Sequence, residues 1–262
     1  MILPVIIYIA VFCYKPMYGV IIAFKNFRPA VGIMDSPWVG LKHFITFFND
    51  YNFWRILKNT FSISALSILF GFPAPILLAL LINEIRNTKF KRAVQTISYM
   101  PYFISMVIIC GLIKTFCQSD GIITDLVVAL GGERVNLLAS KNSNIWQNIG
   151  WDSIIYLAAL AGIDQEQYEA ARVDGAGRIR QIISVTLPGL MPTITILFIL
   201  KMGNILNVGF EKILLLYSPT TYEVADVIST YVYRIGILDA NFSYSTAIGL
   251  FNSVVNIIFL LL

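Results

Sequence analysis

Long apolar segments are the feature that most limits what this chain can fold into. Six segments contain few charged residues, and each is about long enough to cross the roughly 30 Å of bilayer hydrocarbon as a helix. Only 13% of the 262 residues are charged, which is about half the share found in soluble domains. The sequence therefore predicts an all-α, polytopic membrane protein in which residues 1–262 form one transmembrane domain. The expected spans are residues 2–24, 61–83, 97–116, 145–163, 190–208 and 242–262.

Basic residues indicate which face of the membrane each connection occupies. Residues 84–92, after the second span, include Arg86, Lys89, Lys91 and Arg92. Short loops rich in Lys and Arg remain in the cytoplasm. Counting spans from this loop places both termini and residues 164–188 in the cytosol. The other connections are then outside. Amphipathic interfacial helices are expected there at residues 42–58 and 223–235, and a short helix at residues 122–130.

Prolines mark places where the expected helices are irregular. A kink is expected at Lys15-Pro16 in the first span, and Pro73 and Pro75 lie in the middle of the second. Such prolines are tolerated in membrane helices where neighbouring groups satisfy the freed backbone atoms. The pattern favours a packed bundle of helices. A Ser218-Pro219 turn is expected outside the membrane.

The longest polar stretch between two apolar spans is residues 164–188. It predicts two short helices broken at Asp174-Gly175-Ala176, with Asp164 as N-cap and glycine permitting the bend. The second helix is expected to end at Pro188, which lacks a backbone N–H. A plain helical hairpin that joins two spans would explain this pattern without any further role.

A resemblance to a known family implies a function for residues 164–188. The order Glu169-Ala170-Ala171, Asp174-Gly175-Ala176 and Leu187-Pro188 resembles the EAA loop of ATP-binding-cassette importer permeases. In that family the loop is a coupling helix that docks into a groove on the ATPase subunit. The resemblance implies that the following residues couple this chain to an ATPase: Glu169, Ala170, Ala171, Asp174, Gly175, Ala176 and Pro188.

Polar residues inside the expected spans form a candidate substrate site, because such residues are costly in hydrocarbon and face the bundle interior. Helical spacing would place Asn204 with Asn207, and Asn207 with Glu211, on common faces. Aromatic rings cover the C–H face of a sugar, while amides and carboxylates bind its hydroxyls. An interfacial aromatic belt with asparagines between helices is the alternative. The candidate substrate residues are Trp151, Asp152, Tyr156, Asn204, Asn207, Phe210 and Glu211.

A second resemblance indicates the class of substrate. The stretches 204–219 and 222–234, with Pro4, residues 16–19 and residues 38–41, resemble the polysaccharide-type branch of the maltose-type sugar permeases, which includes alginate-oligosaccharide importers. The resemblance implies import of oligosaccharides into a bacterial cell by alternating access. It also implies four kinds of partner: a second homologous permease, two ATPase subunits, an extracellular solute-binding protein and the sugar itself.

The sequence contains no ATP-binding motif of its own, because it has no G-x-x-x-x-G-K-[ST] segment. We therefore expect no enzymatic activity and no cofactor in this chain, with ATP and Mg²⁺ bound on the partner ATPases. His43 is the single histidine and the three cysteines have no metal-like spacing, so no catalytic or metal site is expected. No basic tract suggests nucleic acid. An intramembrane transferase, or an importer of a peptide or ion, remains the alternative.

The charge of the sugar stays open at this stage. Lys201, Lys212 and Arg234 would favour an acidic oligosaccharide, whereas Asp152 and Glu211 argue against one.

Overall fold

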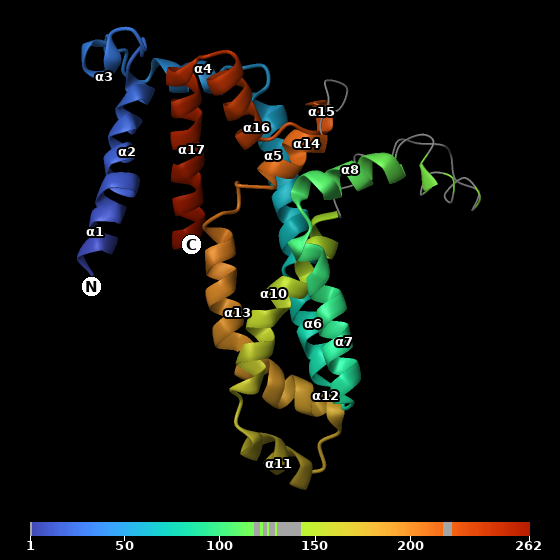
Figure 1. Cartoon of the computed structure of the whole chain (residues 1–262). Coiled ribbons are helices and arrows are strands. Elements are labelled where there is room, and N and C mark those ends of the chain that lie inside the picture. The colour runs from blue at the N-terminus through green and yellow to red at the C-terminus, as the bar shows by residue number, and fades with distance from the viewer. Residues whose placement is uncertain (1, 118–120, 123–124, 126–128, 130–142, 217–221) are drawn as a thin grey trace. The chain divides into compact units, whose positions relative to one another are not determined.

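The computed structural model describes residues 2–117, 121–122, 125, 129, 143–216 and 222–262. These residues form helices, turns and two isolated β-bridges, and no β-strand occurs among them (Figure 1). The expected all-α architecture is thus confirmed. The chain divides into two compact units, which we describe separately: unit 1 is Met1–Phe61 with Ile205–Leu262, and unit 2 is Ser62–Asn204.

Unit 1 contains the first and last helices of the chain. The first runs from Leu3 to Phe24 as four successive helical segments: α1 (Leu3–Ile9), η1 (Ala10–Tyr14), α2 (Lys15–Met17) and η2 (Tyr18–Phe24). The π-helical turn η1 lies immediately before Lys15-Pro16, where an irregularity was expected. The last helix, α17 (Phe242–Leu261), packs against η2 and has nearly the bounds expected for the final span.

Short helices make up the rest of unit 1. They are α3 (Gly32–Asp35), α4 (Lys42–Phe48), the start of α5 (Phe53–Leu66), α14 (Phe210–Leu216), α15 (Tyr222–Ala225), α16 (Ile228–Tyr233) and η8 (Arg234–Leu238). Phe47, Phe53, Leu206, Tyr231 and Ile248 belong to their common buried core. The single helices expected at residues 42–58 and 223–235 are wrong, because the chain turns at Asn49–Asn52 and at Asp226–Val227.

A carboxylate lies at each of these breaks and helps to hold unit 1 together. Asp50 Oδ1 accepts the backbone N–H of Asn52 at 2.8 Å, which turns the chain. Its Oδ2 accepts the hydroxyls of Tyr231 at 2.6 Å and Tyr244 at 2.8 Å. Fully buried Asp226 pairs with Arg234 at 2.6 Å. Charge-assisted bonds of this kind are about twice as strong as neutral ones.

The surroundings of Asp50 shift two pKa values outside the membrane spans. Partial burial acts to raise the pKa of Asp50, but the hydrogen bonds from Tyr231, Asn52 and Tyr244 outweigh burial and lower it. Burial, together with the hydrogen bond to Asp50, raises the pKa of Tyr231 to about 12. The ionised carboxylate and the protonated hydroxyl are therefore the favoured forms at neutral pH.

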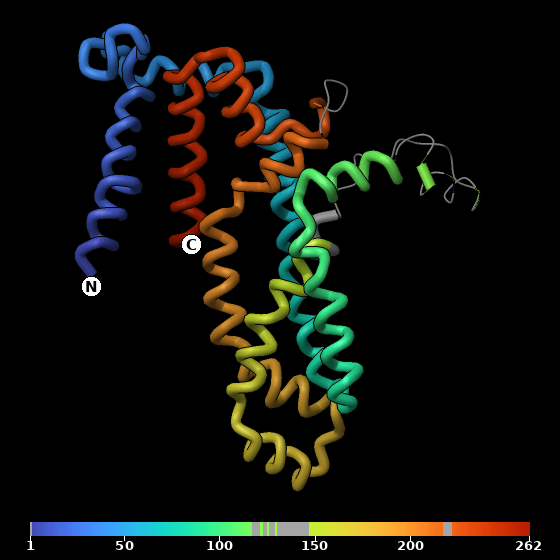
Figure 2. The backbone as a smooth tube through the Cα atoms, viewed as in Figure 1, coloured from blue at the N-terminus to red at the C-terminus, as the bar shows by residue number. Residues whose placement is uncertain are grey.

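Unit 2 is built around α10 (Ser143–Ala161). This helix packs against α6 (Pro73–Asn83), α7 (Thr88–Tyr99), η4 (Met100–Phe103) and α13 (Leu187–Met202). The remaining elements are the end of α5, η3 (Ser67–Gly71), α8 (Met106–Cys117), α11 (Gln165–Val173), α12 (Arg178–Gln181) and η6 (Ile182–Thr186). Ala79, Tyr156, Leu160, Val185 and Leu190 belong to the buried core of this unit. Figure 2 shows the course of its backbone.

Four described helices are long and apolar enough to span a membrane: Leu3–Phe24, Phe53–Asn83, Arg178–Met202 and Phe242–Leu261. A fifth candidate is the pair Thr88–Phe103 and Met106–Phe116, bent by 94°. The third span expected at 97–116 stays a prediction, and its segment is not one straight helix, because the helix breaks after Phe103. The count of six spans stays a prediction, since α10 does not meet the same criteria.

The fifth expected span also differs from the sequence prediction. A continuous helix runs from Arg178 through Pro188 and Pro192 to Met202, so Pro188 does not end a helix. The π-helical turn η6 directly precedes α13. In a regular α-helix the ring of Pro188 would clash with the carbonyl four residues earlier, and the wider π-helical turn relieves this clash. The helix expected at 122–130 and the Ser218-Pro219 turn lie largely or wholly outside the described residues.

A first prediction concerns the close contact of α10 with α7. A Cβ added at Gly150 would lie 1.9 Å from the carbonyl oxygen of Ser98, so Gly150→Ala forces the helices apart. We expect a loss of about 1–3 kcal/mol, typical of overpacking, measured as a lower Tm in detergent. Gly111→Ala is the matched control, because nothing lies within 4 Å of a Cβ at that site. Equal Tm values for both variants would contradict the packing.

A second prediction concerns Asp50. The pKa of Asp50 is lower in the folded chain than in the unfolded chain. Its contribution to the free energy of unfolding is therefore fully present above the unfolded-state pKa, and it is lost as the pH falls through the folded-state pKa. Asp50→Asn should lower Tm at pH 7 by weakening hydrogen bonds worth about 1.5–3 kcal/mol each. The difference in Tm from the wild type should shrink below about pH 4. A difference that does not depend on pH would contradict the ionised role of Asp50.

Candidate functional site: the polar hairpin and the polar ends of two helices

The polar hairpin, by which we mean residues 164–188, begins with a capped helix. Asp164 Oδ1 accepts the backbone N–H of Glu166 at 3.0 Å, and α11 follows. The helix ends at Asp174, and Gly175 has a φ of +74°, which L side chains adopt only with strain. The backbone N–H of Ala176 then returns to the carbonyl of Ala171 at 2.9 Å. The structure thus has two helices with a break at Asp174–Ala176, as the sequence predicts.

One face of α11 is held by unit 2. The hydroxyls of Tyr168 and Thr186 lie 3.0 Å apart and form a hydrogen bond between α11 and η6. Tyr168 and Ala171 also pack against the buried core. Gln181 Nε2 donates to the carbonyl of Ala176 at 2.7 Å and fixes the bend to α12. The hairpin is therefore a firm extension of the helical bundle.

The other face of the hairpin is exposed. Glu169, Ala170, Asp174 and Gly175 are all exposed, and Ala171 and Ala176 are half-buried. Two large apolar side chains, which sequence analysis did not single out, are more exposed still: Val173 at 87% and Ile179 at 75%. Apolar side chains at the tip of a polar hairpin are typical of a surface that another protein covers.

Aromatic rings gather beside Trp151 of α10. Its indole is stacked on Tyr102 with centroids 4.3 Å apart and an interplanar angle of 4°, and Phe103 meets its edge at 5.5 Å. Trp151 and Tyr102 remain 38% and 40% exposed. Tyr102 is far from Trp151 in the sequence, so no local pattern reveals the pair. Together the two rings form a partly open aromatic surface.

The other candidates on α10 differ in exposure. Asp152 is exposed, and Lys201 on α13 lies near enough for its charge to act on the carboxylate. Tyr156 is only 3% exposed and belongs to the core of unit 2, where a sugar has no access. We therefore leave Tyr156 out of the proposed substrate surface.

The predicted helix face shared by Asn204, Asn207 and Glu211 does not exist. Helix α13 ends at Met202, residues 203–209 are not helical, and α14 begins at Phe210. Asn204 belongs to unit 2, and Asn207 to unit 1. The rings of Phe210 and Tyr233 are in contact, with centroids 5.7 Å apart. Glu211 is exposed in the first turn of α14.

The non-helical segment is held by α17. The backbone N–H of buried Leu206 donates to Asn256 Oδ1 at 3.1 Å, and Asn252 Nδ2 donates to Asn207 Oδ1 at 2.9 Å. No local sequence pattern points to Asn252 or Asn256 of α17. Non-helical backbone at membrane depth is tolerated only where protein buries it or where it lines a water-filled cavity. No group of three or more His, Cys, Asp or Glu that could hold a metal occurs in the described part of the chain.

The apolar helices of membrane-spanning length define the class of polytopic membrane proteins, and the capped hairpin is an exposed polar loop between two of its helices. Within this class, the chain belongs to the family of binding-protein-dependent transport system inner membrane components, whose model matches residues 71–262. The matched part includes α10, the polar hairpin and α17.

Two similar proteins match all or nearly all of the chain. It is 46% identical over 271 residues to the polygalacturonan/rhamnogalacturonan transport system permease protein YteP of Bacillus subtilis (strain 168), spanning 100% of this chain and 84% of YteP. It is 45% identical over 267 residues to protein LplB of the same organism, spanning 98% of this chain and 84% of LplB.

A solved structure resembles the chain over its full length. One chain of a bacterial ABC transporter involved in the import of the acidic polysaccharide alginate matches with a TM-score of 0.91 and 48% sequence identity. The match covers 100% of this chain and 91% of that one. Another structure shows a bacterial alginate ABC transporter in complex with an alginate pentasaccharide-bound periplasmic protein; one of its chains matches with a TM-score of 0.91 and 47% identity, covering 100% of this chain and 90% of that one.

A third prediction tests how α17 holds the non-helical segment. Asn256→Ala removes the acceptor of the buried Leu206 N–H, which costs about 1–3 kcal/mol when left unsatisfied. We expect a lower Tm and faster amide exchange at residues 203–209. Ser253→Ala, an exposed position on the same helix, is the control. Similar exchange in both variants would show that Asn256 does not hold the segment.

Proposed function

We propose that the chain is the transmembrane permease subunit of an ATP-driven importer that carries oligosaccharides derived from polysaccharides across the bacterial inner membrane. The observation that carries this proposal is the full-length similarity to YteP and to the alginate transporter chain. The exposed face of the polar hairpin supports it independently, because such a surface needs a partner.

We infer that the energy arrives through the hairpin. Two ATPase subunits, with ATP and Mg²⁺ bound, would close and move the coupling residues Glu169 to Ala176. The continuous helix from Arg178 to Met202 offers a stiff connection from the hairpin into unit 2. A second homologous permease would complete the pathway, and both termini of this chain would lie in the cytosol. The bundle would then alternate between outward-open and inward-open states.

We further propose that the substrate is an acidic oligosaccharide delivered by an extracellular binding protein. Two similar proteins point this way: the polygalacturonan/rhamnogalacturonan permease and the transporter of the acidic polysaccharide alginate. Within this chain, the open aromatic face of Trp151 suits the C–H face of a sugar ring. Asp152 and Asn204 of the same unit would supply further contacts, and a substrate role for Asn207, Phe210 and Glu211 of unit 1 stays a prediction.

A fourth prediction tests the docking role of the hairpin. Glu169→Arg should weaken association with the ATPase roughly 30-fold or more, because the loss of an interfacial charge pair costs about 2–5 kcal/mol. Co-purification from native membranes should then recover the second permease without the ATPase, and uptake should fall. Gly175→Trp should act similarly, because the side chain strains the left-handed backbone.

The control for this experiment is Glu223→Arg, an exposed glutamate on α15 of unit 1 with the same change of charge. It should leave the ATPase bound and uptake unchanged. Retention of the ATPase by both hairpin variants would show that the coupling assignment is wrong. Recovery of the wild-type chain alone, with no ATPase or second permease, would instead refute the assembly.

A fifth prediction tests the substrate surface. Trp151→Ala removes one ring of the aromatic pair, and losing a contact worth about 0.5–1.5 kcal/mol should weaken sugar recognition by about 2- to 12-fold. Initial rates of oligosaccharide uptake, measured against concentration, should show a higher KM. Trp54→Ala, an exposed tryptophan outside the proposed surface, is the matched control. Competition with acidic and neutral oligosaccharides of equal length would reveal the preferred charge.

A further inference from the structure

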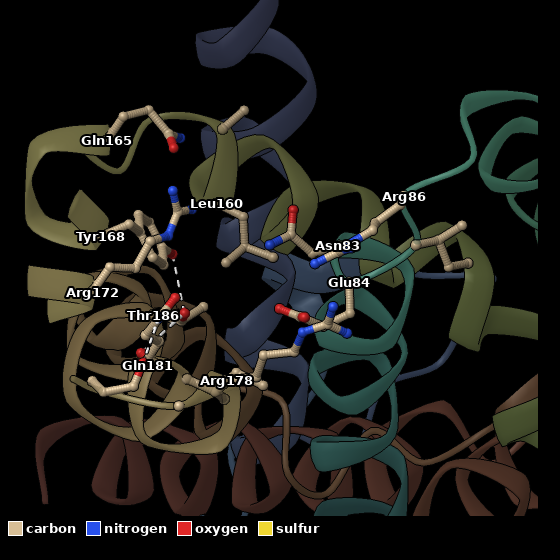
Figure 3. Close-up of a pocket in the computed structure, with 15 residues that line it drawn as sticks. Asn83, Glu84, Arg86, Leu160, Gln165, Tyr168, Arg172, Arg178, Gln181 and Thr186 are labelled. Carbon is tan, nitrogen blue, oxygen red and sulfur yellow. Dashed lines mark hydrogen bonds between the residues drawn. The ribbon is translucent and has the colours of Figure 1, made fainter.

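A cavity of about 770 Å³ lies beside the polar hairpin, within unit 2. Its wall is formed by the end of α6 and the loop that follows, the end of α10, and helices α11, α12 and η6 (Figure 3). Cavities of roughly 300–1,000 Å³ are typical of sites for small molecules. The substrate surface described above contributes no residue to it.

Positive charge converges on this cavity from three separate elements. Arg86 comes from the loop after α6, Arg172 from α11, and Arg178 from the start of α12 (Figure 3). Glu84 is the single acidic residue of the lining, so the side chains of the wall carry a net formal charge of +2. Arginines on one exposed helix face would not meet around a cavity in this way. The arrangement favours an anion with about two negative charges.

The three guanidinium groups form no ion pair or hydrogen bond with the described residues of the fold. No described carboxylate forms an ion pair with Arg86, Arg172 or Arg178, and no described group accepts a hydrogen bond from their side chains. Elsewhere in the chain, by contrast, Arg234 is bound to Asp226 at 2.6 Å. An arginine fork presents parallel N–H groups that match two oxygens of a phosphate.

Neutral donors complete the wall. The side chains of Asn83 and Gln165 line the cavity and make no hydrogen bond with described residues. Tyr168, already bonded to Thr186, adds an aromatic surface. Amide groups beside arginines suit a ligand that carries hydroxyl or ester oxygens as well as phosphate. A bare inorganic ion would leave most of the volume empty.

We propose that this cavity, the arginine cavity, binds a phosphate-bearing organic anion on the cytosolic side of the protein. A phosphate monoester carries about −1.5 to −2 charges at pH 7, which matches the charge of the wall. The ligand is either the headgroup of an anionic phospholipid or a soluble phosphoester. Because Arg172 belongs to the hairpin and Arg86 to the loop after α6, the bound anion restrains the hairpin and regulates its movement.

Amide hydrogen exchange of the purified transporter complex in lipid nanodiscs tests this proposal. One arm compares phosphatidylcholine with a mixture of phosphatidylcholine and phosphatidic acid, whose headgroup is a phosphate monoester. The other adds glucose 6-phosphate to phosphatidylcholine nanodiscs in phosphate-free buffer. At a free ligand concentration of about ten times Kd, local opening of residues 165–182 should slow by about tenfold. The arm that gives this slowing identifies the source of the ligand.

Two triple variants make the test specific. Arg86→Gln, Arg172→Gln and Arg178→Gln together remove the arginines of the cavity, and the slowing should disappear. Lys89→Gln, Arg92→Gln and Arg180→Gln remove the same charge from exposed positions that do not line the cavity. This control should keep the slowing, which separates a binding site from general attraction to an acidic surface.

Three results would overturn the proposal. They are unchanged exchange in both arms, slowing that persists in the cavity variant, and loss of the ATPase from the cavity variant alone. The last result would make these arginines a docking surface for the ATPase. The proposed transport function is tested separately, because absence of oligosaccharide uptake would refute that function and leave the exchange result for the arginine cavity intact.

Discussion

Hydrogen bonding of the backbone is the constraint on which this structure depends. In hydrocarbon, each unpaired N–H or C=O costs several kcal/mol, so a spanning segment must satisfy its backbone groups internally. Prolines in the helices conflict with this requirement. A π-helical turn lies directly ahead of Pro16, Pro73 and Pro188, in η1, η3 and η6. Each wider turn makes room for a proline ring and lets the helix continue.

Where a helix ends, side chains form the hydrogen bonds that the backbone groups would otherwise lack. After Met202 the backbone is non-helical, and Asn256 of α17 supplies the acceptor that Leu206 lacks. Outside the spans, Asp50 performs the same task for the turn between α4 and α5. Polar residues in unit 1 thus hold the irregular segments, whereas apolar packing around α10 holds unit 2.

Sequence patterns predict those features that depend on neighbouring residues. The first and last spans follow from apolar length, and the bend of the hairpin follows from Gly175 with its capped helix. The end of α13 escaped prediction because Ile205, Leu206 and Val208 continue the apolar run, and the spacing of the two asparagines in this segment fits a helix face. The Trp151–Tyr102 stack and the Asn256 contact escaped because they join elements distant in the sequence. Only packing in three dimensions brings such residues together.

The hairpin and its cavity combine rigidity with exposure in a way that suits coupling. A contact that transmits movement must be stiff toward the membrane and open toward the partner. The Tyr168–Thr186 hydrogen bond and the uninterrupted helix from Arg178 to Met202 provide the stiffness. Val173 and Ile179 provide the open face. Between these two sides lies a wall of unpaired arginines, so an anion bound there acts where a small restraint on the hairpin affects the whole helix behind it.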